Sequence, residues 1–389
     1  MRVLQRYFAV SIAQAVAFVL LAFLALQAFM DLTGELPSVG KNGYAIQHAL
    51  LYVLIMLPSH VYEVMPVAAL IGTIYTMAQF ASTSEFTIMR ASSMSTGMAA
   101  WMLFKVGVVL VVITFIFGEL IAPRTTPLAA KIKLSARGAA VSAEFRSGLW
   151  TKDIVKSDGM TGTLAGSRFF NVREVRPDGQ LRDVKLYEFD TNFRLRSLIL
   201  AKSATYQGNN TWRLLEVTEN QFSNSALPRP DSQADAANNF AQATSAVATT
   251  KSASKDLVTE ITPKILSVSG SDPDRMSAAE LAVYTRHLQE NKQETERFKI
   301  AFWKKLIDPL SIFVLMAMAL PFAYLHTRSG GVSLKIFVGI MLGVSFMLVN
   351  TLFSHLGLLS TWPALLTAIA PSALYLLLAL AALWWVERH

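Results

Sequence analysis

Long apolar segments occur in two groups of three along the chain, separated by one extended polar region. Six of them are long enough to be membrane-spanning helices: Phe8–Met30, Val64–Ala81, Met98–Ile121, Leu306–Leu325, Val332–Phe353 and Pro363–Val386. At about 1.5 Å per residue, the first of them exceeds the ~30 Å hydrocarbon core of a bilayer. The sequence therefore predicts a polytopic α-helical membrane protein with six transmembrane helices arranged 3+3.

The central polar region has the alternating pattern of β-strands. Apolar and polar residues alternate over Asp183–Phe189, Leu195–Tyr206 and Thr211–Phe222, and turn residues such as Gly208-Asn209-Asn210 separate these runs. No helical pattern intervenes, which favours a meander or β-jelly-roll over βαβ units. We therefore expect an inserted all-β domain.

Two further segments complete the insertion. Residues 223–256 shift to Ala, Ser, Thr, Asn and Gln, which is typical of a long mobile loop. Ser277 and Glu280 form a capping-box pattern that predicts the start of a return helix over about 277–298. The expected domains are 1–125 with the first three spans, 126–298 with the β-jelly-roll, and 299–389 with the last three spans.

Composition and charge narrow the class of protein. Hydrophobic residues make up 53% of the chain and charged residues 16%, and the net charge of +8 has no basic stripe interleaved with aromatics that would indicate nucleic-acid binding. The absence of cysteine excludes disulfides, thiolate catalysis and cysteine metal sites. Arginine and lysine in the short loops place both termini in the cytoplasm and the large insertion outside it, because long translocated domains are exempt from that rule.

The chain offers little chemistry of its own. Gly34 to Asn42 resembles a phosphate-binding loop, but the spacing is one residue too long and Asn42 replaces the required Ser or Thr. His60 and Glu63, between Pro58 and Pro66, suggest either a metal pair or a proton relay. The alternative, which we favour, is a broken helix that exposes both side chains to water. We expect no catalytic residue, no metal site and no enzymatic activity.

The connection between the second and third spans predicts a short helix over about 84–95. Thr83 or Ser84 can cap it, Glu85 lies in its first turn, and Phe86, Met89 and Arg90 follow at helical spacing. Such a helix suits contact with a separate motor subunit. An ordinary interfacial turn with a buried aromatic explains the same pattern.

Several segments, in this order and spacing, resemble the LptF/LptG permeases over nearly the whole chain. They are Ser84–Ser92 with Met94-Ser95, Gly118-Glu119, Ala122-Pro123, Gly148-Leu149-Trp150 and Met276–Leu281. Gly148-Leu149-Trp150 and Tyr284–Leu288 are more similar to the LptG branch than to the LptF branch.

The resemblance implies a subunit of the ABC transporter that exports lipopolysaccharide from the inner membrane of a Gram-negative bacterium. Implied partners are an LptF-like second permease, a dimeric LptB-like ATPase that binds ATP and Mg²⁺, a single-span LptC-like protein, and a periplasmic LptA-like bridge. The chain itself would hold no cofactor. The short helix would dock on the ATPase, with contacts from Glu85, Phe86, Met89, Arg90, Ala91 and Ser92.

Substrate contacts are expected from two spans and from basic residues near their outer ends. Apolar candidates for the cavity and its gates lie on the first and fifth spans: Phe18, Phe23, Phe29, Phe337, Met341 and Phe346. Contact with lipid alone accounts for at least half of the apolar side chains on these two spans. Family members often carry lysines after the first span, whereas this chain has Asp31 and Glu35, which would repel phosphate unless a divalent cation intervened. The basic candidates are Lys41, Lys299, Lys304 and Lys305. Snorkelling at a water interface explains the last three equally well.

Two other classes of function account for parts of this pattern. A membrane-anchored interaction protein would transmit ATPase motion to a periplasmic partner without passing lipid, and its β domain would need only an apolar outer patch. An ion-coupled carrier is disfavoured because no carboxylate lies in the middle of a span and the two halves show no evident inverted repeat.

Overall fold

The computed structural model describes residues 2–41, 43–91, 95–137, 148–158, 161–176, 179–222, 247–263, 265–266, 272–291, 293–324, 331–360 and 362–388. The chain forms two compact units. The helical unit comprises Met1–Lys133, Pro273–Thr285 and Glu294–His389, and the β unit comprises Leu134–Asp272 and Arg286–Gln293. Residues 286–293, within the segment where the return helix was expected, thus belong with the β-strands.

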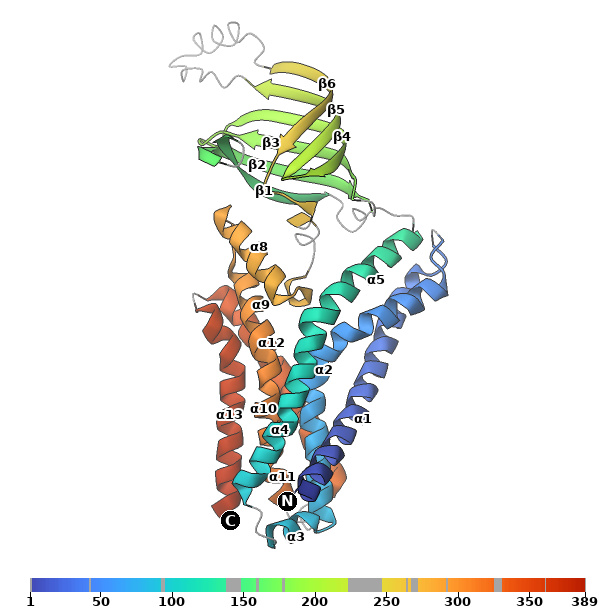
Figure 1. Cartoon of the computed structure of the whole chain (residues 1–389), viewed down its shortest axis with the longest axis vertical. Helices are drawn as coiled ribbons and strands as arrows, with labels where there is room; N and C mark the ends of the chain where they lie inside the picture. Colours follow the sequence, from blue (N-terminus) through green and yellow to red (C-terminus); the bar gives the residue numbers. More distant parts are fainter. Residues whose placement is uncertain are drawn as a thin grey trace, which may run out of the picture. The chain divides into compact units, whose positions relative to one another are not determined.

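The helices follow one another in chain order (Figure 1). Their bounds are α1 Arg2–Glu35, η1 Leu36–Ser38, α2 Ile46–Ser82, α3 Glu85–Ala91, α4 Thr96–Phe115, the π-helical η2 Ile116–Ile121, α5 Ala122–Arg137, η4 Pro273–Arg275, α8 Ala278–Glu290, α9 Glu296–Ile307, η5 Asp308–Leu310, α10 Ser311–Met318, α11 Pro321–Tyr324, α12 Val332–Leu359 and α13 Ala364–Arg388. The two chain ends lie at the same end of the helical unit (Figure 1).

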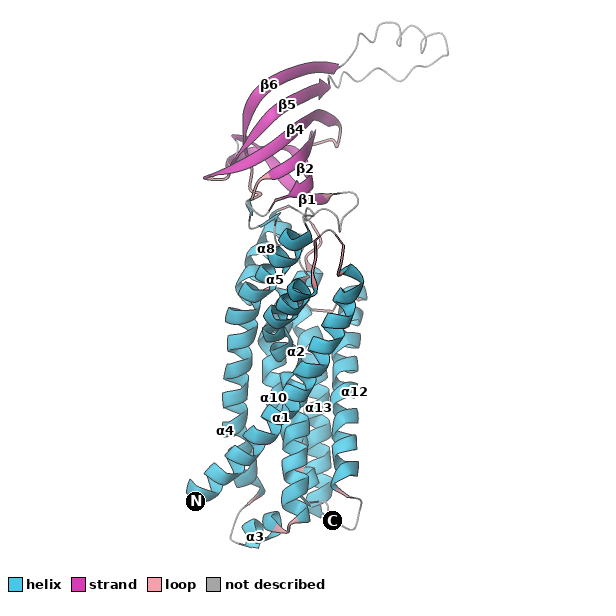
Figure 2. Cartoon of the chain, turned by 90° about the vertical axis from the view of Figure 1, so that its right-hand side faces the viewer, coloured by secondary structure: helices cyan, strands magenta, loops and turns pink. Residues whose placement is uncertain are grey.

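Among the described residues, six helical segments are long and apolar enough to cross a membrane (Figure 2). They are Val3–Ser38, Ile46–Ser82, Thr96–Lys133, Glu296–Tyr324, Val332–Leu359 and Ala364–Val386. Helices suit this environment because they satisfy their own backbone hydrogen bonds in lipid. The prediction of a six-span helical protein with an inserted β domain is confirmed.

The second span differs from its expected form. We expected a helix broken near Pro58 and Pro66, but α2 is continuous through both prolines. A proline removes one N–H from the hydrogen-bond ladder, which a helix packed on several sides tolerates. His60 is accordingly buried, at 7% exposure, whereas Glu63 is exposed as expected.

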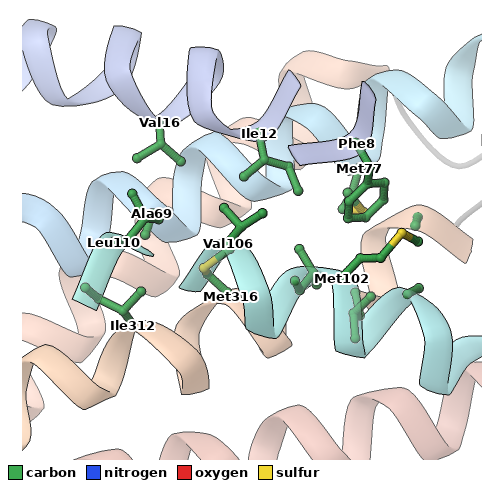
Figure 3. Close-up of a cluster of buried hydrophobic side chains, with 14 of the residues drawn as sticks. Phe8, Ile12, Val16, Ala69, Met77, Met102, Val106, Leu110, Ile312 and Met316 are labelled. Atoms are coloured by element: carbon green, nitrogen blue, oxygen red, sulfur yellow. The ribbon is translucent and has the colours of Figure 1, made fainter. Parts of the chain in front are cut away.

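The core of the helical unit forms where α1, α2, α4 and α10 converge (Figure 3). Its buried side chains include Phe8, Ile12, Val16, Ala69, Met77, Met102, Val106, Leu110, Ile312 and Met316. Most of the second span is buried, whereas the first and fifth spans leave most of their surface uncovered. Therefore α2 is the central helix around which the others pack.

Glycines allow α1 and α12 to approach α2 closely. A Cβ atom added at Gly72 would lie 2.7 Å from the Cα atom of Val16, so α1 and α2 meet backbone to backbone. On α12, a Cβ at Gly343 would lie 2.7 Å from a methyl carbon of Val67, and one at Gly339 would lie 2.9 Å from the Cδ1 atom of Ile74. Gly339 and Gly343 form a small-xxx-small pattern, a known packing signal for membrane helices that our sequence reasoning missed.

The β unit contains six described strands in one antiparallel sheet (Figure 2). Their bounds are β1 Leu149–Asp158, β2 Thr161–Val175, β3 Leu181–Phe189, β4 Leu195–Gly208, β5 Thr211–Phe222 and β6 Val247–Val258. Each strand pairs with the next in the chain. This order is that of a meander, the first of our two alternatives, and the described strands lack the Greek-key crossovers of a strict jelly roll.

One face of the sheet forms a dense apolar core. Its fully buried side chains include Phe170, Leu181, Leu186, Ile199, Trp212 and Leu214. Alternation along the strands is interrupted at Asp183, whose φ of 49° lets Leu181 share a face with Leu186. Ile261 and Leu266, which follow the last strand, are buried in the same core.

Two expectations about the insertion need correction. The mobile loop expected over 223–256 overlaps β6, which starts at Val247; residues 223–246 lie outside the described part. Nearly all of β6 is exposed on both faces, so the strand lacks the apolar alternation that identifies a half-buried strand.

The return helix expected over 277–298 is two helices, because α8 ends at Glu290 and α9 begins at Glu296. Its capping box is present: the Ser277 hydroxyl accepts from the Glu280 N–H, and the Ser277 N–H donates to the Glu280 carboxylate.

Candidate functional site

The short helix α3 is held against the helical unit by its apolar side. The Phe86 side chain is 2% exposed, and its ring meets the Tyr324 ring edge-on, with 5.1 Å between centroids. Met89 is also buried. The Tyr324 hydroxyl donates a hydrogen bond to the Thr96 hydroxyl at 2.8 Å, which joins α11 to the start of α4. α3 is therefore anchored on the ends of the spans.

A polar contact fixes the beginning of the same helix. The Glu85 carboxylate accepts hydrogen bonds from the Tyr7 hydroxyl at 3.0 Å and from the Thr83 hydroxyl at 2.9 Å. Ser84, between α2 and α3, has a φ of 61°, in the left-handed region that allows the chain to turn sharply. Through Tyr7, the start of α3 is tied directly to the first span.

The exposed side of α3 includes two of the expected residues, Arg90 and Ala91, together with two that we did not expect, Thr87 and Ile88. Thr87, Ile88, Arg90 and Ala91 are exposed, and Ile88 is 63% exposed. The Arg90 guanidinium lies 4.9 Å from the centre of the Tyr324 ring. Phe86 and Met89 were expected on a docking surface, and this is corrected: both are anchors that face the chain's own spans. Ser92 lies outside the described residues.

The first and fifth spans carry long uncovered apolar faces. On α1, Phe18 and Phe29 are 75% and 65% exposed, and Phe23 is half-buried. On α12, Phe337 and Met341 are 58% and 52% exposed. Phe346 differs, because it is buried and its ring meets that of Tyr375 on α13 edge-on at 5.1 Å. Its expected place on a cavity surface is corrected.

The basic candidates differ in whether their ammonium groups are free to contact a lipid phosphate. Lys305 is only 4% exposed, with its ammonium 4.3 Å from the centre of the Tyr62 ring, so it is not available to a lipid phosphate. The Lys304 ammonium donates to the Ser354 hydroxyl at 3.0 Å, and Lys299 pairs with Glu296 at 2.9 Å; both lysines are half-buried. Lys41 is exposed.

The acidic residues after the first span have structural partners. One carboxylate oxygen of Asp31 lies 2.7 Å from Nε2 of His60 on α2, and Nδ1 of His60 lies 3.4 Å from Glu63. This arrangement ties α1 to α2 by a polar contact at the end remote from the chain termini. No group of His, Asp and Glu suited to a metal ion occurs in the part of the chain that the structure describes.

Glu35 makes a second connection of this kind. Its carboxylate is buried, lies 2.6 Å from the Lys133 ammonium on α5, and accepts a hydrogen bond from the Tyr44 hydroxyl. The Lys133 ammonium also lies 5.0 Å from the centre of the Tyr52 ring. The two carboxylates therefore hold helices together, and their expected repulsion of a substrate phosphate stays a prediction.

A buried polar cluster joins the end of α8 to β1 within the β unit. Asp153 is 1% exposed, accepts a hydrogen bond from the Thr259 hydroxyl, and lies 3.6 Å from the Arg168 guanidinium. Burial raises the pKa of Asp153, and both of these partners oppose that change. Burial lowers the pKa of His287, against the attraction of Asp153, Glu260 and Glu290 for its charged form. The structure thus favours a neutral imidazole here.

Acidification is expected to loosen the end of α8 from the sheet. The pKa of His287 in the folded state lies below its ordinary value of 6.5, so its contribution to stability is present above about pH 6.5 and is lost as the pH falls toward the folded pKa. Hydrogen exchange of residues 286–290, corrected for intrinsic rates, measures the loosening and should become faster as the pH falls from about 7.5 to about 5.5.

The contribution of His287 is the difference in acid sensitivity of this exchange between the wild type and His287→Gln. Asp153 acts in the opposite direction, because its raised pKa favours the folded state at low pH. Burial is the main cause of that raised pKa and His287 is the weakest of the groups that influence it, so most of the Asp153 contribution is present in both chains. His355→Gln, on the exposed surface of α12, is the matched control and should keep the wild-type response. Equal acid sensitivity in His287→Gln and the wild type would contradict the assignment.

Comparison with known proteins accounts for the chain as a whole. The family described as Lipopolysaccharide export system permease LptF/LptG matches residues 6–385. The chain is 27% identical over 387 residues to the Lipopolysaccharide export system permease protein LptG of Escherichia coli K12, covering 99% of this chain and 98% of that protein. It is 28% identical over 384 residues to the protein of the same name from Haemophilus influenzae, covering 98% and 97%. With six spans, an inserted antiparallel sheet and a match over nearly its whole length, the chain belongs to the LptF/LptG family of lipopolysaccharide export permeases.

Proposed function

We propose that this chain is a permease subunit that takes lipopolysaccharide from the inner membrane and passes it, through its β unit, toward a periplasmic bridge to the outer membrane. The observation that carries the proposal is the family match over residues 6–385. Two LptG proteins that align over nearly their full lengths support the same function, with LptG as the more similar branch.

The proposal includes an orientation and a set of partners. Both termini lie in the cytoplasm and the β unit lies in the periplasm. This orientation is supported by basic residues at the ends of the spans nearest the chain termini, namely Arg2, Arg6 and Arg90. Family membership implies an LptF-like permease, a dimeric LptB-like ATPase, a single-span LptC-like protein and an LptA-like bridge. ATP and Mg²⁺ bind the ATPase, and this chain is a transport subunit without a cofactor of its own.

In this mechanism α3 receives the motion of the ATPase and passes it to the spans. Its exposed side, centred on Ile88, contacts the ATPase. Phe86 transmits the force to Tyr324 on α11, and Glu85 transmits it to Tyr7 on α1. Because these contacts reach two separate spans, a displacement of α3 changes the position of one span relative to another.

The uncovered faces of α1 and α12 suit a substrate with several acyl chains. Each CH₂ group moved out of an apolar environment costs about 0.8 kcal/mol, so extraction needs an equivalent apolar surface. Phe18, Phe29, Phe337 and Met341 supply part of it. Lys41 is the exposed basic candidate for a phosphate, and Lys299 and Lys304 can reach one only by exchanging their present partners.

Site-specific photocrosslinking tests the proposal. A photoreactive phenylalanine at Phe18 or at Met341, in the complete complex with ATPase, is expected to capture lipopolysaccharide before ATP is added and much less of it afterwards. The same group at Phe8, which is fully buried on α1, is the matched control and should capture none. Lipid crosslinks that persist in full with ATP, or equal capture at Phe8, would contradict the proposal.

A further inference from the structure

An apolar groove of about 600 Å³ lies between α1 and α4, in the half of the helical unit nearest the chain termini. Its lining residues are Gln5, Ala9, Val10, Ala13, Val16, Ala17, Leu20, Met65, Met102, Lys105, Val106, Val109, Leu110 and Ile113. Four of these lining residues, Val16 on α1 and Met102, Val106 and Leu110 on α4, also belong to the buried core drawn in Figure 3. The groove lies within the size range of pockets that bind small molecules, ~300–1,000 Å³.

The polar part of this lining consists of only two side chains. Gln5 lies near the start of α1, and Lys105 lies nine residues after the start of α4 at Thr96, about 14 Å along the helix axis. The remaining lining is apolar. The groove therefore has the polarity of an amphiphile, with a long apolar section and a cation toward one end.

Lys105 is exposed and belongs to a membrane-spanning segment. A charge at that depth is costly unless it reaches the polar interface or meets an opposite charge. Side chains on a helix lean toward its N-terminus, and the Lys105 ammonium lies 5.6 Å from the ring of Trp101, one turn nearer the chain termini. The ammonium thus reaches toward the lipid head groups, as snorkelling lysines do.

Among the described residues, no carboxylate balances the charge of Lys105. None of the described carboxylates lies within ion-pair distance of its ammonium, and no acidic side chain lines the groove. An anion with an attached apolar chain would complement both parts of the site, since the chain would fill the apolar section while the anion meets the ammonium.

We propose that this groove binds one anionic phospholipid from the membrane leaflet next to the chain termini. One acyl chain lies along Ala13 and Ala17 on α1, and the phosphate contacts Lys105 on α4. The lipid fills the space beside the first span and stays bound there. This inference does not rest on the export function, because the groove, its charge and its neighbours belong to this chain alone.

Native mass spectrometry of the full-length chain, purified with its accompanying subunits, tests the proposal. Phosphatidylglycerol and phosphatidylcholine with identical acyl chains are titrated in turn. We expect the wild type to bind one phosphatidylglycerol per chain with at least about fivefold preference, and Lys105→Gln to lose that preference, as about 1 kcal/mol per basic residue near a membrane surface implies. Arg388→Gln is the matched control, because Arg388 also lies over an exposed tryptophan, Trp384, but outside the groove.

A second pair of variants tests the apolar section. Ala17→Phe fills the groove and should reduce binding of both lipids, whereas Ala22→Phe places the same ring on an exposed position of α1 outside the groove and should not. Unchanged selectivity in Lys105→Gln, or equal losses in Ala17→Phe and Ala22→Phe, would overturn the proposal. The proposal would also be overturned if the purified Ala17→Phe complex lost its single-span subunit but kept its lipid binding. That result would show that a partner's helix fills the groove.

Discussion

Replacing Phe86 with alanine is expected to detach α3 from the spans and to abolish stable association with the ATPase. The ring is almost fully buried against Tyr324, and truncation of a buried phenylalanine typically costs about 3–5 kcal/mol. A helix of seven residues has little stability apart from its packing, so this loss acts mainly on α3. Hydrogen exchange of residues 85–91 measures the detachment, and co-purification of the ATPase measures the association.

A substitution on the opposite side of α3 separates anchoring from contact. Ile88→Glu adds a charge where the side chain is 63% exposed, so hydrogen exchange of α3 should remain that of the wild type. Association with the ATPase should nevertheless fall, because the charge would be buried at the contact. Thr87→Ala, also exposed, is the neutral control. If Ile88→Glu kept full association while Phe86→Ala kept wild-type exchange, both assignments on α3 would be wrong.

The second large effect is expected at Trp212 in the β unit. Trp212→Ala should destabilise the sheet by about 3–5 kcal/mol, because its side chain is fully buried and is the largest in that core. Its indole N–H donates to the Ile261 carbonyl oxygen at 2.7 Å, and so holds the segment after β6 against the sheet. The measurement is hydrogen exchange of the β4 and β5 amides in the full-length chain.

Trp212→Phe distinguishes packing from the hydrogen bond. It keeps an aromatic ring in the core but leaves the Ile261 carbonyl without its donor, which costs about 1–3 kcal/mol for a buried acceptor. We expect residues 259–266 to exchange faster while β4 and β5 remain protected. Leu215→Ala, a partly exposed position on β5, is the control and should leave both regions unchanged. Protection of β4 and β5 in Trp212→Ala equal to that of the wild type would contradict the prediction.

The six spans were predictable because the bilayer restricts them so strongly. A segment that crosses ~30 Å of hydrocarbon must be long, apolar and internally hydrogen-bonded, and each of these properties is local in sequence. The capping box at Ser277 and the half-buried strands were predictable for the same reason, since their signals lie within a few residues. The polar strand β6 was missed because its pairing with β5 is a contact between distant residues.

The candidate site was predictable only in part. Helical spacing places Phe86, Met89 and Arg90 near one another, but periodicity does not tell whether a face packs on its own chain or on a partner. The lysines show the same limit: Lys305 and Lys41 were both candidates as basic residues near the outer ends of spans, yet one is buried beside Tyr62 and the other is exposed.

The sequence by itself determined the number of spans, the inserted sheet and the family, because apolar length, strand alternation and the order of short motifs are all carried by the chain. Only the tertiary structure decided which residues face inward, that Asp31 and Glu35 join helices, and that Lys105 borders an apolar groove. These properties arise from contacts between residues far apart in the chain, and such contacts exist only after the helices have packed.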